Sequence, residues 1–112
     1  MNSLASSTTN RRLNQYLTND IQGASPEQLI MKVYDFAILS CRRQEMLKTN
    51  EALQVLITSL NFENEAAKEI SVGLLKLYQY CQEQMRKKKF REVEIILTDL
   101  RNTWSVALQS RG

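Results

Sequence analysis

The chain has 112 residues, with 15 Lys and Arg against 12 Asp and Glu, a formal net charge of +3, two Cys and no His. This length suits one compact domain with a single small core. Without His, the chain lacks His-based catalytic triads, imidazole general bases and most zinc sites. It also has no glycine-rich phosphate loop, so we expect neither enzyme activity nor a cofactor or metal.

The composition is that of a folded protein without a membrane anchor. Apolar residues make up 43% of the chain and charged residues 24%, which is ordinary globular usage. The longest apolar runs, such as residues 36–39, fall far below the roughly 18 residues that span a bilayer. The first residues lack the basic and apolar regions of a secretory signal. We therefore expect a cytoplasmic protein with no stable membrane insertion.

Residues 1–20 form the first segment and are predicted to be a mobile arm. Eleven of them are Ser, Thr, Asn or Gln, which is too polar to bury a core. Leu13, Tyr16 and Leu17 recur at i, i+3 and i+4, which predicts a short amphipathic turn or capping helix. Residues 21–112 then form a single helical domain.

The first strong helix signal lies at residues 25–28. Ser25 suits the N-cap, Pro26 the first helical position, and Gln28 completes a capping box. A stripe of apolar residues then runs to about Leu47. A second helix is predicted from about Thr49 or Asn50, and the two helices could be nearly continuous. The stripe of the first helix comprises Ile30, Val33, Tyr34, Ala37, Ile38 and Cys41, and that of the second comprises Leu53, Leu56, Ile57 and Leu60.

Two further helices follow the interruption at residues 61–65. A break between them is predicted at residues 87–89, where three Lys repel one another and favour solvent. No alternating strand pattern occurs between the turn signals, so the fold class is all-α, an antiparallel four-helix bundle with short connections. The inner faces comprise Ala66, Ile70, Leu74, Leu77, Tyr78, Cys81 and Met85 on one helix, and Phe90, Val93, Leu97, Leu100, Trp104 and Leu108 on the other. On these faces Cys41 and Cys81 behave as small hydrophobic residues.

Several large apolar residues lie away from these stripes. A bundle this small cannot bury both sides of every helix, so together they predict grooves for an amphipathic partner helix, the arm of the same chain or a second copy. They are Leu29, Phe36, Leu39, Val55, Val72, Leu75, Ile95 and Val106.

The segment from Tyr16 to Ala37 resembles the N-terminal signature of the flagellar secretion chaperone FliS family. The shared elements are Tyr-x-x-Asn, a spacer ending in Ala-Ser-Pro, and Gln-Leu-Ile leading to Tyr-Asp-x-Ala. Further on, the segments Ser59–Asn61, Leu74–Tyr80 and Leu100–Trp104 are similar to the family's middle and C-terminal marks. The resemblance covers roughly residues 13–108. Phe36 stands where members of the family usually carry a small residue.

The resemblance implies a cytoplasmic export chaperone. Such a protein binds the C-terminal region of flagellin, prevents premature polymerisation and delivers flagellin to the export gate; other flagellar regulators are possible partners. The resemblance also associates the arm, here Leu13, Tyr16 and Leu17, with capping the cargo site and docking at the gate. By helical phase, the predicted cargo-binding residues are Leu29, Val33, Phe36, Val72, Leu75 and Ile95.

Two alternatives use other features of the chain. The basic run at residues 86–91 contains five of the 15 basic residues and could bind nucleic acid. A solvated helix end is favoured, because there is neither a second basic patch nor an aromatic stacking set, and we expect no nucleic-acid partner. A homodimeric scaffold with the off-stripe residues at its seam is the other alternative.

Overall fold

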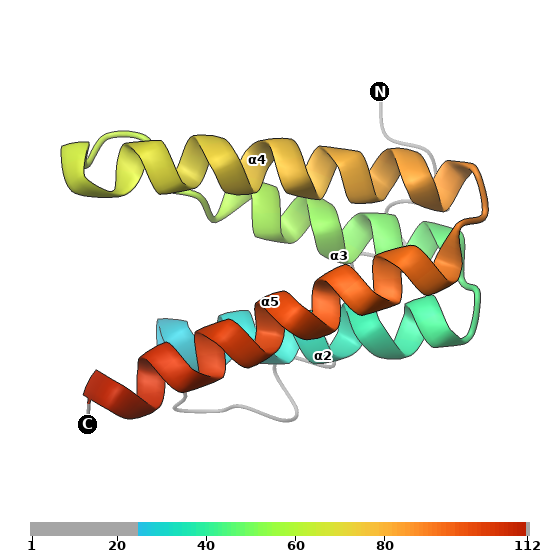
Figure 1. Cartoon of the computed structure of the whole chain (residues 1–112), viewed down its shortest axis with the longest axis horizontal. Helices are drawn as coiled ribbons and strands as arrows, with labels where there is room; N and C mark the ends of the chain where they lie inside the picture. Colours follow the sequence, from blue (N-terminus) through green and yellow to red (C-terminus); the bar gives the residue numbers. More distant parts are fainter. Residues whose placement is uncertain (1–24, 112) are drawn as a thin grey trace.

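The computed structural model describes the backbone of residues 25–111, which form four helices (Figure 1). In chain order they are α2 (Pro26–Arg42), α3 (Met46–Thr58), α4 (Glu65–Arg86) and α5 (Phe90–Arg111). Each helix packs against the next along the chain and α5 also packs against α2, which closes a ring of four neighbours. The predicted all-α antiparallel bundle is confirmed for this part of the chain. None of the described helices has the length and apolarity to cross a membrane.

The start of α2 follows the sequence pattern. Ser25 Oγ accepts the Gln28 N–H at 3.2 Å, and Gln28 Oε1 accepts the Ser25 N–H at 2.9 Å. Pro26 occupies the first helical position. The predicted capping box is therefore confirmed.

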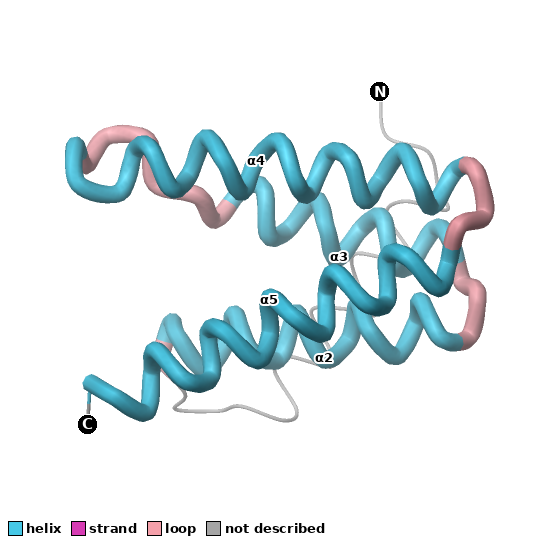
Figure 2. Tube along the Cα trace, viewed as in Figure 1, coloured by secondary structure: helices cyan, strands magenta, loops and turns pink. Residues whose placement is uncertain are grey.

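The boundary between the first two helices differs from the prediction. The helix α2 ends at Arg42 rather than near Leu47, and α3 begins at Met46 after a reversal of the chain (Figure 2). Gln44 takes a left-handed conformation with φ 59°. A helix C-terminus of this kind usually carries Gly at the left-handed position. Because this chain carries Gln there, the sequence offered no stop signal.

The turn between α4 and α5 has the same construction. Lys88 is left-handed with φ 62°, and the Lys89 N–H donates to Gln84 O at 2.9 Å. At the first turn the Glu45 N–H donates to Ser40 O, also at 2.9 Å. The predicted break at residues 87–89 is confirmed. Both turns thus use a hydrogen bond over five residues and a non-glycine residue in a conformation that favours Gly.

Glycine at either left-handed position is expected to stabilise the fold. Gln44→Gly or Lys88→Gly should raise the free energy of unfolding by about 0.5–1 kcal/mol, because relief of the left-handed strain outweighs the extra entropy of Gly in the unfolded chain. Arg43→Gly is the matched control, since Arg43 is exposed beside Gln44 with φ −82° and should lose stability. Urea unfolding measures all three. If Gln44→Gly lowers the free energy of unfolding as much as the control does, the left-handed conformation of Gln44 does not destabilise the fold.

The core lies at the centre of the ring of helices. Its largest fully buried members come from all four helices and include Tyr34, Leu53, Tyr78, Met85 and Leu97. A polar contact between α2 and α3 also lies inside it, where the Ser40 and Thr49 hydroxyl oxygens share a hydrogen bond of 2.9 Å. This contact satisfies two buried hydroxyls next to the turn.

Both thiols belong to this core. Cys41 and Cys81 are fully buried, and burial raises the pKa of Cys41 to about 11 and that of Cys81 to about 12. Their helices, α2 and α4, are diagonal partners with no Cα pair within 8 Å. A disulfide needs Cα atoms within roughly 7 Å, so the two cannot be bridged without moving the helices. The interpretation of both as small hydrophobic residues is confirmed.

Candidate partner-binding surface

Three of the predicted cargo-binding residues lie on α2. Val33 is only 2% exposed and belongs to the core, so it is not accessible to a partner in this structure. Its place on the same stripe as Tyr34 and Ala37 explains this burial. Phe36 is half-buried and packs against the core, and Leu29 is half-buried.

The other three predicted residues lie on α4 and α5. Val72 is 37% exposed and Leu75 is half-buried one turn later on α4. Ile95 is 49% exposed and lies close to the α4–α5 turn, whereas Val72 and Leu75 lie in the N-terminal half of α4, toward the opposite end of this helix pair (Figure 1). The structure therefore brings Val72 and Leu75 together but does not bring Ile95 to them.

The N-terminal half of α4 is more exposed than its sequence pattern predicts. Ala66 and Ile70 were expected on the inner face, but Ala66 is exposed and Ile70 is 65% exposed, so this prediction is wrong. The helix α4 has 22 residues and α3 only 13, so the first turns of α4 extend beyond their neighbour. Nothing lies within 4 Å of the position that a Cβ at Gly73 would take. Ile70 and Gly73, three residues apart, thus form an open strip on one side of α4, whereas Val72 lies two residues from Ile70 and therefore on another side.

The helices α4 and α5 approach each other at their connecting turn and are farther apart at their other ends (Figure 1). Near the turn, Glu92 accepts hydrogen bonds from the Tyr80 hydroxyl and from Gln84 Nε2. Farther along α5, Ile95 is 49% and Val106 is 66% exposed. Ile96, Leu100 and Leu108 are half-buried. This side of the bundle therefore keeps apolar surface in solvent.

Ion pairs join α5 to α2 on the other side. Arg101 Nε lies 2.8 Å from Asp35 Oδ1, and Arg42 Nε lies 2.7 Å from Glu94 Oε2. All four side chains are partly exposed, so each pair contributes at most about 1 kcal/mol. Their main effect is to fix the register of α2 against α5.

Three aromatic residues connect α2, α4 and α5 inside the bundle. Trp104 Nε1 donates to the Tyr34 hydroxyl at 3.1 Å, and the Tyr34 and Tyr78 hydroxyls share a hydrogen bond of 2.5 Å. Burial raises the pKa of both tyrosines, so both stay neutral at physiological pH. The pattern had placed all three on inner faces but could not show that their polar atoms meet. Trp104 itself is partly buried.

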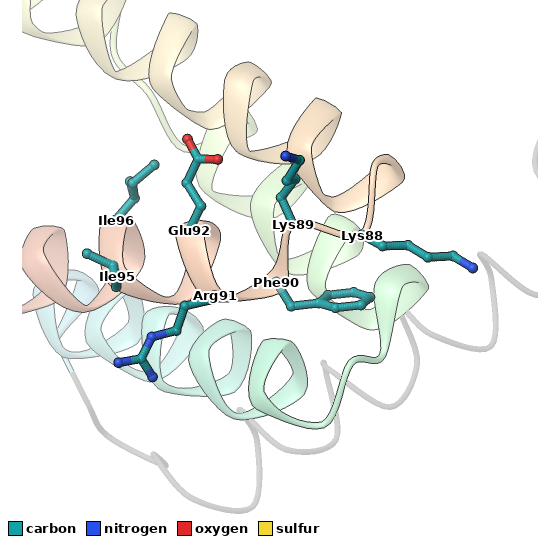
Figure 3. Close-up of a pocket in the computed structure, with 7 residues that line it drawn as sticks. All are labelled: Lys88, Lys89, Phe90, Arg91, Glu92, Ile95 and Ile96. Atoms are coloured by element: carbon teal, nitrogen blue, oxygen red, sulfur yellow. The ribbon is translucent and has the colours of Figure 1, made fainter.

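A pocket of about 550 Å³ lies at the start of α5 (Figure 3). Its apolar lining consists of Phe90, Ile95 and Ile96. The charged residues around them are Lys88, Lys89, Arg91 and Glu92. The hydrogen bond from Tyr80 lowers the pKa of Glu92, so this carboxylate is charged at neutral pH. The pocket therefore combines an apolar surface with an excess of positive charge.

The described residues include Cys, Asp and Glu side chains, which could hold a metal ion if three or more of them met in space. No group of three or more Cys, Asp and Glu side chains is placed to hold a metal ion within them. The neighbours Tyr34 and Asp35 diverge, since Tyr34 contacts Tyr78 and Asp35 contacts Arg101. A small all-α bundle with apolar side chains left at its surface is the architecture of a helical binding or chaperone module.

Comparison with family models places the chain within that class. The model described as "Flagellar protein FliS" matches residues 9–111, nearly the whole chain. The chain therefore belongs to the FliS family, a family of flagellar export chaperones rather than enzymes. Searches of curated proteins and of solved structures returned no match. The predicted arm residues Leu13, Tyr16 and Leu17 lie outside the described residues, so their role stays a prediction.

Proposed function

We propose that this protein is a cytoplasmic chaperone that binds the C-terminal region of flagellin, prevents its premature polymerisation and delivers it to the flagellar type III export apparatus. Membership of the FliS family supports this role. The observation that carries it is the apolar surface of α4 and α5, where Ile70, Val72 and Val106 are 65%, 37% and 66% exposed. These residues do not serve the core, so their exposure is best explained by a partner.

Helical docking on this surface fits the chemistry of the proposed cargo. An amphipathic segment that is disordered before assembly can lay its apolar face on exposed apolar side chains. Ordering such a segment costs about 2–5 kcal/mol or more, so a long apolar contact is required for tight binding. A segment held in this way cannot use the same apolar face for polymerisation.

The N-terminal half of α4 is the first proposed contact. Val72 and Leu75 share one side of this half, and Ile70 and Gly73 share another. Leu75 is half-buried without packing against the buried core, so a partner can cover it at little cost to the fold. Leu29 and Phe36 are proposed as further cargo contacts, whereas Ile95 lies near the α4–α5 turn and belongs to a separate surface. In the proposal Leu13, Tyr16 and Leu17 cover the apolar surface in the absence of cargo and dock the loaded chaperone at the export gate.

Placing charge on α4 tests the proposal. The double variant Ile70→Asp/Val72→Asp should bind a flagellin C-terminal peptide about tenfold more weakly or worse, because the introduced carboxylates are desolvated in the complex. Isothermal titration calorimetry measures the affinity, and sedimentation of flagellin with each variant measures suppression of polymerisation.

Leu47→Asp is the matched control, since Leu47 is 60% exposed but lies at the start of α3, which carries no proposed cargo contact. Its affinity should stay within about twofold of the unchanged protein, because exposed residues outside an interface contribute little. Circular dichroism should show the same helicity for every variant. Unchanged affinity in the α4 variant would rule out α4 as the contact. If the unchanged protein fails to bind flagellin at all, the proposed cargo is wrong.

A further inference from the structure

One end of the bundle carries an uneven share of the positive charge. The α2–α3 and α4–α5 turns both lie at this end (Figure 2), and the Arg42–Glu94 ion pair links α2 to α5 beside them. Residues 42–48 and 83–94, which form these turns and the adjoining helix ends, contain eight basic and four acidic residues, a formal charge of +4. The whole chain carries +3, so the rest of the molecule is close to neutral. We call this end the basic pole.

The cations at the basic pole are largely uncompensated. Three of its eight basic residues have acidic partners, in the pairs Arg42–Glu94, Lys48–Glu45 and Arg86–Glu83. Within the described part of the chain, no ion pair involves the remaining basic residues of the α4–α5 turn, which are Lys87, Lys88, Lys89 and Arg91. All four are exposed. Like charges held this close oppose folding slightly, and a bound anion would relieve the repulsion.

The pocket at the start of α5 opens among these cations (Figure 3). Ile95 and Ile96 provide its apolar side, and Ile95 is 49% exposed. In the same view Lys89 and Arg91 extend to opposite sides of the α5 backbone. A volume of about 550 Å³ lies within the range of roughly 300–1,000 Å³ typical of ligand sites. A ligand here meets apolar carbon from Ile95 and Ile96, three cations, and the Glu92 carboxylate, which already accepts hydrogen bonds from Tyr80 and Gln84.

We infer that the basic pole is a docking site for an acidic amphipathic peptide segment, whose apolar side chains enter the pocket against Ile95 and Ile96 while its carboxylates face Lys89 and Arg91. Charge complementarity selects this occupant. Single-stranded nucleic acid is disfavoured because the only aromatic lining residue, Phe90, is half-buried and packs against the core, which leaves no open ring for base stacking. An anionic membrane is disfavoured because Ile95 is the sole large apolar side chain exposed in the lining.

The inference does not depend on the proposed flagellin cargo. The basic pole lies at the turn end of α4 and α5, whereas Ile70, Val72 and Gly73 lie in the N-terminal half of α4, toward the other end. The two surfaces can therefore be occupied separately. A variant that loses binding at one surface should keep binding at the other. Failure of the proposed flagellin contact can therefore be distinguished from failure of the inference about the basic pole.

Fluorescence anisotropy with a defined probe tests the inference on the full chain. The probe is a fluorescein-labelled peptide of about 14 residues with Leu at helical i, i+3 and i+4 spacing and Glu at its polar positions. A second peptide keeps every Leu and replaces each Glu by Lys. We expect saturable binding of the Glu peptide only, weakening several-fold between about 50 and about 300 mM NaCl as salt screens the charges.

Paired charge reversals locate the site. Lys89→Glu/Arg91→Glu should weaken binding of the Glu peptide about tenfold or more. Lys68→Glu/Lys76→Glu reverses the same number of exposed charges on α4 and should change the affinity less than about twofold. Ile95→Ser should also weaken binding, because the apolar contact is lost. All these side chains are exposed, and circular dichroism checks that each variant is folded.

Three results would overturn the inference. The first is equal binding of the Glu and Lys peptides, and the second is equal loss in both charge-reversal variants. The third is tighter binding of an oligothymidylate or of phosphatidylglycerol vesicles than of the Glu peptide, which would show a general polyanion or membrane surface. The flagellin peptide, titrated in parallel, should bind the Lys89→Glu/Arg91→Glu variant as tightly as the unchanged protein.

Discussion

Trp104→Ala is expected to lower the free energy of unfolding by about 3 kcal/mol, a large share of the stability of a domain this small. Trp104 packs against the core from α5, and its Nε1 donates to Tyr34. Removing the indole opens a cavity and takes away one partner of a buried hydroxyl. Because Trp104 is only partly buried, the expected loss lies at the lower end of the range for Trp→Ala changes.

Two other substitutions separate packing from hydrogen bonding. Trp104→Phe keeps most of the apolar contact and loses only the N–H, so it should cost about 1 kcal/mol. Val106→Ala, at a residue 66% exposed on the same helix, should cost less than about 0.5 kcal/mol. Urea unfolding followed by circular dichroism gives all three values. A Trp104→Ala curve that coincides with that of Val106→Ala would show that α5 is not held by Trp104.

Alkaline pH is expected to destabilise the protein strongly. The unfolded chain releases thiol protons near the ordinary Cys pKa of 9.0, whereas the folded chain keeps Cys41 and Cys81 protonated up to a pKa of about 11 and about 12. The stability due to these thiols is therefore complete below pH 9 and is lost as the pH rises toward 12. A thiol that is ionised in the unfolded chain but still protonated in the folded chain lowers the free energy of unfolding by about 1.4 kcal/mol for each pH unit.

Urea unfolding at a series of pH values between about 8 and about 11 measures this slope. The double variant Cys41→Ala/Cys81→Ala should be less stable at pH 8 but should lose stability less steeply above pH 9, because Tyr34 and Tyr78 are then the remaining buried groups whose pKa burial raises. A slope identical to that of the unchanged protein would mean that the two thiols are not the groups responsible. Ellman's reagent should also fail to label either thiol of the folded protein at pH 8.

Local signals in the sequence predicted the helix starts and the core better than the helix ends. The capping box at Ser25 and Gln28 and the Lys-rich break before Phe90 were both identified, because each depends on residues only a few positions apart. The end of α2 at Arg42 was missed, because the reversal uses a left-handed Gln44 where Gly would have been recognisable. A helix end that depends on a left-handed non-glycine residue cannot be recognised from the residue types alone.

Prediction of the candidate surface was less complete than prediction of the fold. Helical phase separated inner from outer positions, and it correctly suggested that Val72 and Ile95 are exposed. It could not show that Val33 is buried while Ile70 is 65% exposed, since both fit an apolar stripe. The difference depends on how far the neighbouring helices extend, and α3 is too short to cover the first turns of α4.

The sequence by itself determined the all-helical class, the single small core, the burial of both thiols and the family to which the chain belongs. These properties follow from hydrophobic periodicity and from residues in a fixed order along the chain. Tertiary structure alone decided which residues distant in sequence meet. Asp35 pairs with Arg101, Trp104 reaches Tyr34, and the two turns join their charges into one basic pole. Such contacts depend on the lengths and crossing of helices, which periodicity within one helix does not specify.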